Sequence, residues 1–159
     1  MGFFKSKNGS IMSDYFKLLE KIGNYEAGNM YDVALYNDHL EITGPFQKNK
    51  IILNYNQITD IFYGYQTDLK EVKKSVISRA VAGGLLFGGL GAVVGSVSGV
   101  GTKTKQEKNL YLIISYTSLH GEEQFIQFED TRKYKGGKLV EMLRGYTGIT
   151  NPANRDIQL

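Results

Sequence analysis

Cysteine is absent from this 159-residue chain, and histidine and proline occur only twice each. The lack of cysteine excludes a disulfide scaffold, a thiolate nucleophile, a zinc finger and an iron–sulfur site. The two histidines, His39 and His120, stand in sequence turns, where a solvated side chain is expected rather than a general base. No nucleophile–base pair or set of metal ligands is recognisable. We therefore expect no enzymatic activity, no metal and no cofactor.

Glycine is the residue in excess, with 19 copies, 8 of which lie between Gly83 and Gly101. The length of the chain allows one domain with one sizeable insertion. Hydrophobic residues make up 42% of the chain and charged residues 22%, which are ordinary values for a globular protein. The sequence thus predicts one folded domain that carries a glycine-rich insertion.

The first part of the chain is predicted to form one helix and then four strands. Apolar residues from Tyr15 to Ile22 have helical spacing, with Ser13 as the N-cap and Gly23 at the end. The pattern then changes to a period of two, which is typical of strands. These strands are expected at residues 31–35, 40–42, 50–55 and 58–65. Their short connections favour antiparallel neighbours.

The part of the chain that follows the glycine cluster is predicted to form a second hairpin and a helix. Alternating apolar residues at 110–116 and 124–128 flank a turn at His120-Gly121. Residues 133–146 have helical spacing, although two glycines weaken the first turn. Antiparallel strands with one C-terminal amphipathic helix predict an α+β, mainly β fold: a partly open barrel of two near-orthogonal sheets, capped by the helix.

Four segments carry a resemblance to a known family: VALYNDHLEITG, IILNYNQITDIFYG, LYLIISYTSLHGEEQFIQFED and KLVEMLRGY. In this order they resemble the bacterial pleckstrin-homology-like (PH-like) domains, some of which carry a similar glycine-rich stretch after the fourth strand. The resemblance implies a binding or assembly role without catalysis. The inositide-binding loop of the eukaryotic relatives is basic and lies between their first two strands. The corresponding turn here, residues 36–39, is acidic, so inositide binding is not expected.

The glycine-rich segment contains 22 consecutive uncharged residues, from Ala80 to Gly101. A single helix of this length would span about 33 Å, enough to cross a bilayer core. Its eight glycines would cost a solvated helix roughly 6 to 8 kcal/mol relative to alanine, so such a helix needs packing partners. We favour a hairpin of two short helices that turns near Gly88, because the strands on either side must rejoin one small sheet.

Five glycines of the segment are spaced by 4, 3, 4 and 4 residues, which places them on a helical stripe about 80° wide. Such a stripe of small residues lets a second helix approach closely. The predicted helix-packing and oligomerisation residues are Gly84, Gly88, Gly91, Gly95 and Gly99. The remaining helix surface, which would contact membrane or a partner, is formed by Leu85, Leu86, Phe87, Leu90, Val93, Val94 and Val97.

Basic residues flank the insertion on both sides. Residues 70–108 contain seven Lys or Arg and two Glu, a net charge of +5, whereas the rest of the chain carries −2. At the base of a hairpin these cations would meet anionic headgroups at about 1 kcal/mol each. The predicted headgroup contacts are Lys73, Lys74, Arg79, Lys103 and Lys105. Because the charge is confined to the flanks, nucleic-acid binding is not expected.

The sequence therefore predicts a non-catalytic module that associates with a membrane, or with its own copies, through a glycine-zipper hairpin. The alternatives are a soluble scaffold or protein-interaction adaptor with the hairpin buried in an interface, and a flexible glycine-rich loop between solvated lysines. The partners expected are the chain itself, membrane lipid or another protein. Because no secretory signal is recognisable, we expect a cytoplasmic protein at the inner face of the cell membrane.

Five segments follow from this organisation. A leader with the short helix is predicted at 1–23, and the first half of the PH-like domain at 24–72. The hydrophobic hairpin occupies 73–105, the second half of the domain with its helix 106–146, and a tail 147–159.

Overall fold

The computed structural model describes residues 9–65, 68, 77, 80, 109–132 and 135–149. Among them are seven strands, a short 3-10 helix and a C-terminal helix. The strands of the first half are β1 (Met12–Leu18), β2 (Met30–Leu35), β3 (His39–Thr43) and β4 (Ile51–Asn54), and the 3-10 helix η1 (Tyr55–Gln57) follows them. The second half comprises β5 (Ile58–Tyr65), β6 (Leu110–Thr117), β7 (Glu123–Asp130) and α5 (Gly137–Thr147).

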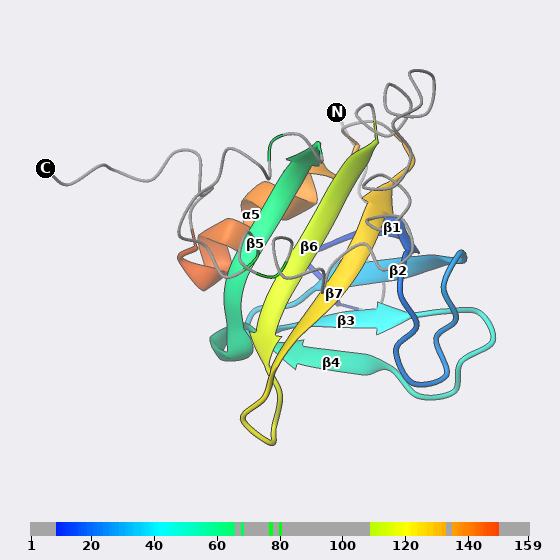
Figure 1. Cartoon of the computed structure of the whole chain (residues 1–159), viewed down its shortest axis with the longest axis horizontal. Coiled ribbons are helices and arrows are strands. Elements are labelled where there is room, and N and C mark those ends of the chain that lie inside the picture. The colour runs from blue at the N-terminus through cyan, green and yellow to red at the C-terminus, as the bar shows by residue number, and fades with distance from the viewer. Residues whose placement is uncertain are drawn as a thin grey trace, which may run out of the picture.

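The seven strands form one antiparallel sheet in the order β4-β3-β2-β1-β7-β6-β5. The two halves of the sheet meet at β1 and β7, which are joined by only two residue pairs. In Figure 1, β5, β6 and β7 lie in front and cross β2, β3 and β4 at a steep angle, with α5 beside β5. The sheet does not close, because β4 and β5 stand at its two ends. The predicted mainly antiparallel, partly open architecture with a C-terminal helix is confirmed.

The main core lies between the two halves of the bent sheet. Every strand contributes to it, and α5 adds Leu139, Val140 and Leu143, all fully buried. Phe16 and Phe128 bring β1 and β7 together with ring centroids 5.7 Å apart. Burial of these apolar side chains is the main force that holds the two halves together.

The helix predicted after Ser13 is wrong, because this segment forms strand β1. Met12, Phe16 and Leu18 are buried, whereas Tyr15 is 51% exposed. The buried residues are separated by even numbers of positions, as expected for one face of a strand. The apolar residues 15–22 also fit a helical face, but pairing with β2 along six residues satisfies the backbone of β1 in extended form. Residues 12–18 are thus a central strand of the sheet and not a helix.

Two further sequence expectations need correction. β4 and β5 follow each other in the chain but stand at opposite ends of the sheet, so they are not the neighbours that their short connection predicted. The sequence predicted no strand before residue 31, but β1 precedes it. The loop between the first two strands is therefore residues 19–29, and the turn at 36–39 joins the second strand to the third. The glycine-rich segment correspondingly follows the fifth strand.

Helix α5 begins at Gly137, with Gly136 as its N-cap, so the two glycines mark its start rather than weaken its interior. A Cβ added to Gly136 would lie 2.6 Å from the ring of Phe16, too close for any other residue without a shift. The carboxylate of Asp130 accepts hydrogen bonds from Gly136 N (2.9 Å), Tyr63 Oη (2.6 Å) and Arg132 N (3.1 Å). This buried side chain therefore connects β5, β7 and the start of α5.

Candidate functional site

The predicted functional residues lie almost entirely in the segment that connects β5 to β6. The glycine stripe, the apolar helix surface, the flanking cations and the helical hairpin itself lie outside the described residues. Within this segment, Asp68, Ile77 and Ala80 are described, and each is helical. The structure also describes the part of the sheet from which the segment starts and to which it returns.

Both ends of the insertion are held at one place in the sheet. Tyr65 at the end of β5 and Leu110 at the start of β6 are cross-strand partners. Residues 66–109, which number 44, thus leave and rejoin the sheet at neighbouring strands. Partners in an antiparallel pair are about 5 Å apart, whereas the ends of a straight helix of the uncharged segment would be about 33 Å apart. A segment that doubles back fits this attachment.

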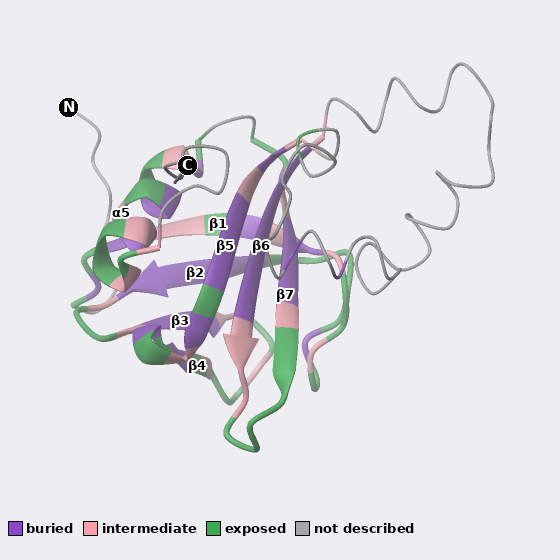
Figure 2. Ribbon diagram, turned by 60° about the vertical axis from the view of Figure 1, so that its left-hand side comes forward, coloured by how far each residue is buried: buried purple, intermediate pink, exposed green. Residues whose placement is uncertain are grey.

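The start of the insertion is packed on the sheet through an apolar group that we call the outer-face cluster. It consists of Phe62, Ile77, Ala80, Tyr111 and Ile113, all buried. Along β5 and β6 these positions alternate with the residues of the main core, so both faces of these strands are covered. Figure 2 shows the resulting burial of β5 and β6 along most of their length.

Polar contacts and half-buried residues surround the outer-face cluster. Leu19 and Phe125 pack at its margin. Gln127 on β7 is buried and is the cross-strand partner of Ile113 on β6. Its side-chain amide donates a hydrogen bond to the carboxylate of Glu20. The backbone N–H of Leu19 donates to the carbonyl oxygen of Gln127 over 2.9 Å. The segment that follows β1 therefore also belongs to this face of the sheet.

We expect Ile77→Ala to release the insertion from the sheet without unfolding the domain. Loss of a buried isoleucine side chain costs about 2 to 5 kcal/mol, while the main core on the other face stays intact. Opening of the outer-face cluster should then become at least about thirtyfold more frequent. The readout is nitration of Tyr111, 1% exposed in the wild type, measured by mass spectrometry alongside far-UV circular dichroism.

The control for this prediction is Ile52→Ala, because Ile52 on β4 is 58% exposed and lies on the other half of the sheet. This variant should leave the nitration rate of Tyr111 unchanged. Equal nitration in the wild type and the Ile77 variant would show that Ile77 does not hold the insertion to the sheet.

A second group of polar residues lies at the turn between β2 and β3, where the sequence predicted a solvated histidine. Instead, the side chain of His39 is only 22% exposed and contacts Asp38 and Glu41. The signal in the sequence was the pair of acids at positions −1 and +2, because residues 39 and 41 share one face of a strand. A shallow pocket of about 500 Å³ adjoins this turn. Its walls include Asn37, Asp38, Asn54, Tyr55 and Tyr146.

Within the described ranges, no group of three or more His, Asp or Glu side chains is arranged so that it could hold a metal ion. No helix in the described part of the chain is both long and apolar enough to cross a membrane. Of the aromatic residues near the end of β5, Phe62 belongs to the outer-face cluster and Tyr63 donates its hydroxyl to Asp130.

Comparison with known proteins gives one match. Residues 21–130 match a family model described as "Glycine zipper containing PH domain". The match begins after β1 and covers β2 to β7, including the whole insertion. It indicates a binding module and no enzymatic family. No curated protein and no solved structure matches the chain significantly.

Proposed function

This chain belongs to the family of glycine zipper-containing PH domains, and from this premise we propose that it is a non-catalytic assembly module. The PH domain serves as a rigid support for the glycine-zipper segment. Through that segment the protein associates with an anionic membrane surface and with its own copies. The observation that carries this proposal is the attachment of the insertion, whose two ends are a cross-strand pair and whose start is packed on the sheet.

The way in which the insertion is attached to the sheet supports a segment held in a fixed position rather than a flexible linker. Flexible linkers are rich in Gly and Ser, whereas this insertion places Ile77 and Ala80 in a buried apolar cluster. Its start is thereby fixed relative to the sheet, and an uncharged stretch with 8 glycines follows in the sequence. Where an apolar segment of this length is exposed on a protein, it is typical of a membrane or protein interaction site.

A soluble scaffold or adaptor, with the hairpin buried in a protein interface, is the second candidate function. It is favoured by the same cluster, because Ile77 and Ala80 pack against protein, including the aromatic rings of Phe62 and Tyr111. In this case the oligomer would persist without lipid or detergent. Membrane association predicts instead an association that depends on anionic lipid and weakens with salt.

Deletion of residues 81–101 should abolish association while leaving the domain folded. The deletion keeps Ile77 and Ala80, so the outer-face cluster stays covered, and it leaves the charge of the flanks unchanged. The wild type is expected to sediment with vesicles of phosphatidylcholine and phosphatidylglycerol, and the deletion variant to remain in the supernatant. Light scattering with and without detergent then separates lipid-dependent from lipid-independent assembly.

Vesicles of phosphatidylcholine alone are the control for the charge of the lipid. A wild-type protein that is monomeric in light scattering and fails to bind either kind of vesicle would overturn the proposed function. A detergent-independent oligomer that ignores both vesicles would establish the scaffold in its place.

A further inference from the structure

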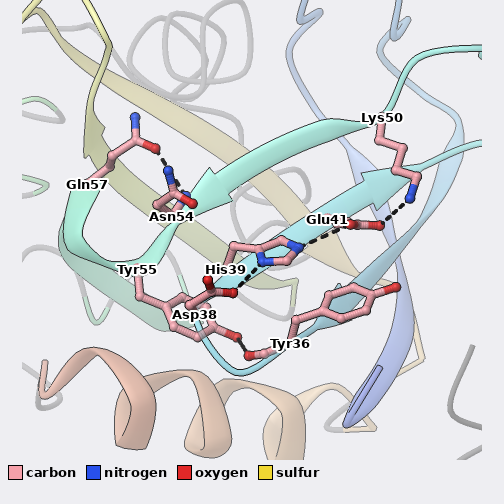
Figure 3. Close-up of polar contacts among 8 residues, drawn as sticks. All are labelled: Tyr36, Asp38, His39, Glu41, Lys50, Asn54, Tyr55 and Gln57. Carbon is pink, nitrogen blue, oxygen red and sulfur yellow. Dashed lines mark hydrogen bonds and ion pairs between the residues drawn. The ribbon is translucent and has the colours of Figure 1, made fainter. Parts of the chain in front are cut away.

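The turn between β2 and β3 holds a histidine between two carboxylates. Figure 3 shows the imidazole of His39 with Asp38 on one side and Glu41 on the other. Nδ1 lies 2.7 Å from Oδ1 of Asp38, and Nε2 lies 3.1 Å from Oε2 of Glu41. The ring also stacks on Tyr36, with centroids 4.8 Å apart and planes 4° from parallel. Both ring nitrogens are thus engaged by anions.

This geometry selects one protonation state of His39. An ionised carboxylate only accepts hydrogen bonds, and a neutral imidazole carries one N–H donor and one lone pair. A neutral ring would direct its lone pair at one of the two carboxylates. Only the imidazolium, with two N–H groups, donates to both.

The charged groups around the ring agree with this assignment. The hydrogen bond to Asp38 is the largest influence on the pKa of His39 and raises it above the ordinary value of 6.5. Burial acts in the opposite direction with a smaller effect, and the bond to Glu41 raises the pKa further. The bond from His39 lowers the pKa of Asp38. Burial alone would raise the pKa of Glu41, but its bonds with His39 and with Lys50, which approaches to 3.1 Å, lower it.

The described elements packed against the turn act on it through Tyr55 and Asp32. From η1, Tyr55 donates its hydroxyl to the carbonyl oxygen of Tyr36, and its N–H donates to the carbonyl oxygen of Asp38. From β2, Asp32 acts electrostatically on Tyr36. The backbone of the turn is therefore held by η1, while its charge is set by His39, Asp38, Glu41 and Lys50.

We propose that His39 is a proton-binding site built into the β2–β3 turn, whose occupancy sets the charge of the adjoining pocket. With the proton bound, the two cations and two carboxylates of the group balance. Without it, the group carries a net charge of −1, and one of the two carboxylates, Asp38 in the pocket wall or Glu41, has lost its donor. The same pocket thus presents a neutral wall in mildly acidic solution and an anionic wall in alkaline solution.

The sign of the effect on stability follows from the pKa directions. Since the pKa of His39 is raised in the folded state, its contribution is complete below about pH 6.5 and is lost as the pH rises through the folded value. The contributions of Asp38 and Glu41, whose pKa values are lowered, are lost in acid instead. The turn is therefore most stable between these two limits.

The test is a proton NMR titration of the two histidines, which are distinguished by the variants His39→Gln and His120→Gln. The midpoint of His39 is expected above 6.5 in the wild type and lower in Asp38→Asn. Asp38 is suited to this test because its side chain is 85% exposed, so its replacement does not endanger folding. His120→Gln should leave the midpoint of His39 unchanged.

A second measurement separates this role from simple packing. The difference in free energy of unfolding between the wild type and His39→Gln should shrink from about pH 6 to about pH 9. A midpoint at or below 6.5, a midpoint that does not respond to Asp38→Asn, or a pH-independent difference in stability would each overturn the proposal.

Discussion

Leucine in place of Gly91, Gly95 and Gly99 is expected to abolish assembly although it makes the protein more hydrophobic. In the proposed helix the spacing of the three glycines places them on one stripe, and close approach of a second helix requires that this stripe carry no side chains. Three leucine side chains would fill the groove. We expect the apparent dissociation constant of the assembly to rise at least tenfold, about 1.4 kcal/mol or more.

The matched control places the same three leucines at Gly83, Gly89 and Gly101. On a helix these glycines lie about 80° or more from the stripe, so the variant has identical composition with the groove preserved. Sedimentation of both variants against the wild type measures the effect. If both variants assemble like the wild type, general hydrophobicity and not a glycine zipper drives association. Loss of assembly in both would equally exclude a stripe-specific effect.

Replacement of Asp130 by alanine should destabilise the domain more than replacement of Asp38 or Glu141. The variant loses three hydrogen bonds and leaves Tyr63 Oη and Gly136 N without their carboxylate partner beside the core. Hydrogen bonds to charged groups contribute about 1.5 to 3 kcal/mol each, and we expect a loss of roughly 3 to 5 kcal/mol. Stabilities of domains are about 5 to 15 kcal/mol in total.

Urea unfolding followed by far-UV circular dichroism measures this loss. Glu141→Ala, an exposed carboxylate on α5, is the control and should change stability little. The variant Tyr63→Phe tests the mechanism, because its cost should be smaller in the Asp130→Ala background than in the wild type. Additive costs in this cycle would contradict the role assigned to the contact between Tyr63 and Asp130.

The sequence was sufficient to predict the hairpins and the C-terminal helix, because their period and turn residues are local signals. It failed at β1, where Tyr15, Phe16, Leu18 and Leu19 satisfy both a helical and a strand pattern. The segment forms a strand because its backbone pairs with β2. The local pattern of apolar residues does not show which strand a segment pairs with. The same reason explains the separation of β4 from β5, since a short connection does not reveal a bend in the sheet.

The candidate sites show the same division. The glycine spacing and the basic flanks are sequence signals, and the family match confirms a PH domain with a glycine zipper. The outer-face cluster could be predicted only in part. Tyr111 and Ile113 lie in the apolar strand predicted at 110–116, whereas their packing with Ile77 depends on the path of the insertion. The two contacts of His39 with carboxylates were not predicted, because a histidine in a turn is expected to be solvated. The contact with Glu41 forms because residues 39 and 41 lie on one face of the strand that follows the turn.

The place of the insertion also affects the order in which the domain folds. β6 and β7 are joined by 5 residues, whereas β5 and β6 can pair only after 44 residues have closed into a loop. The longer loop costs about 2 kcal/mol more in chain entropy. β5 therefore pairs with β6 late in folding. During synthesis the uncharged segment is made before β6, because it precedes β6 in the sequence. The chain must pass through a stage in which this uncharged segment has been synthesised but the strands that follow it have not.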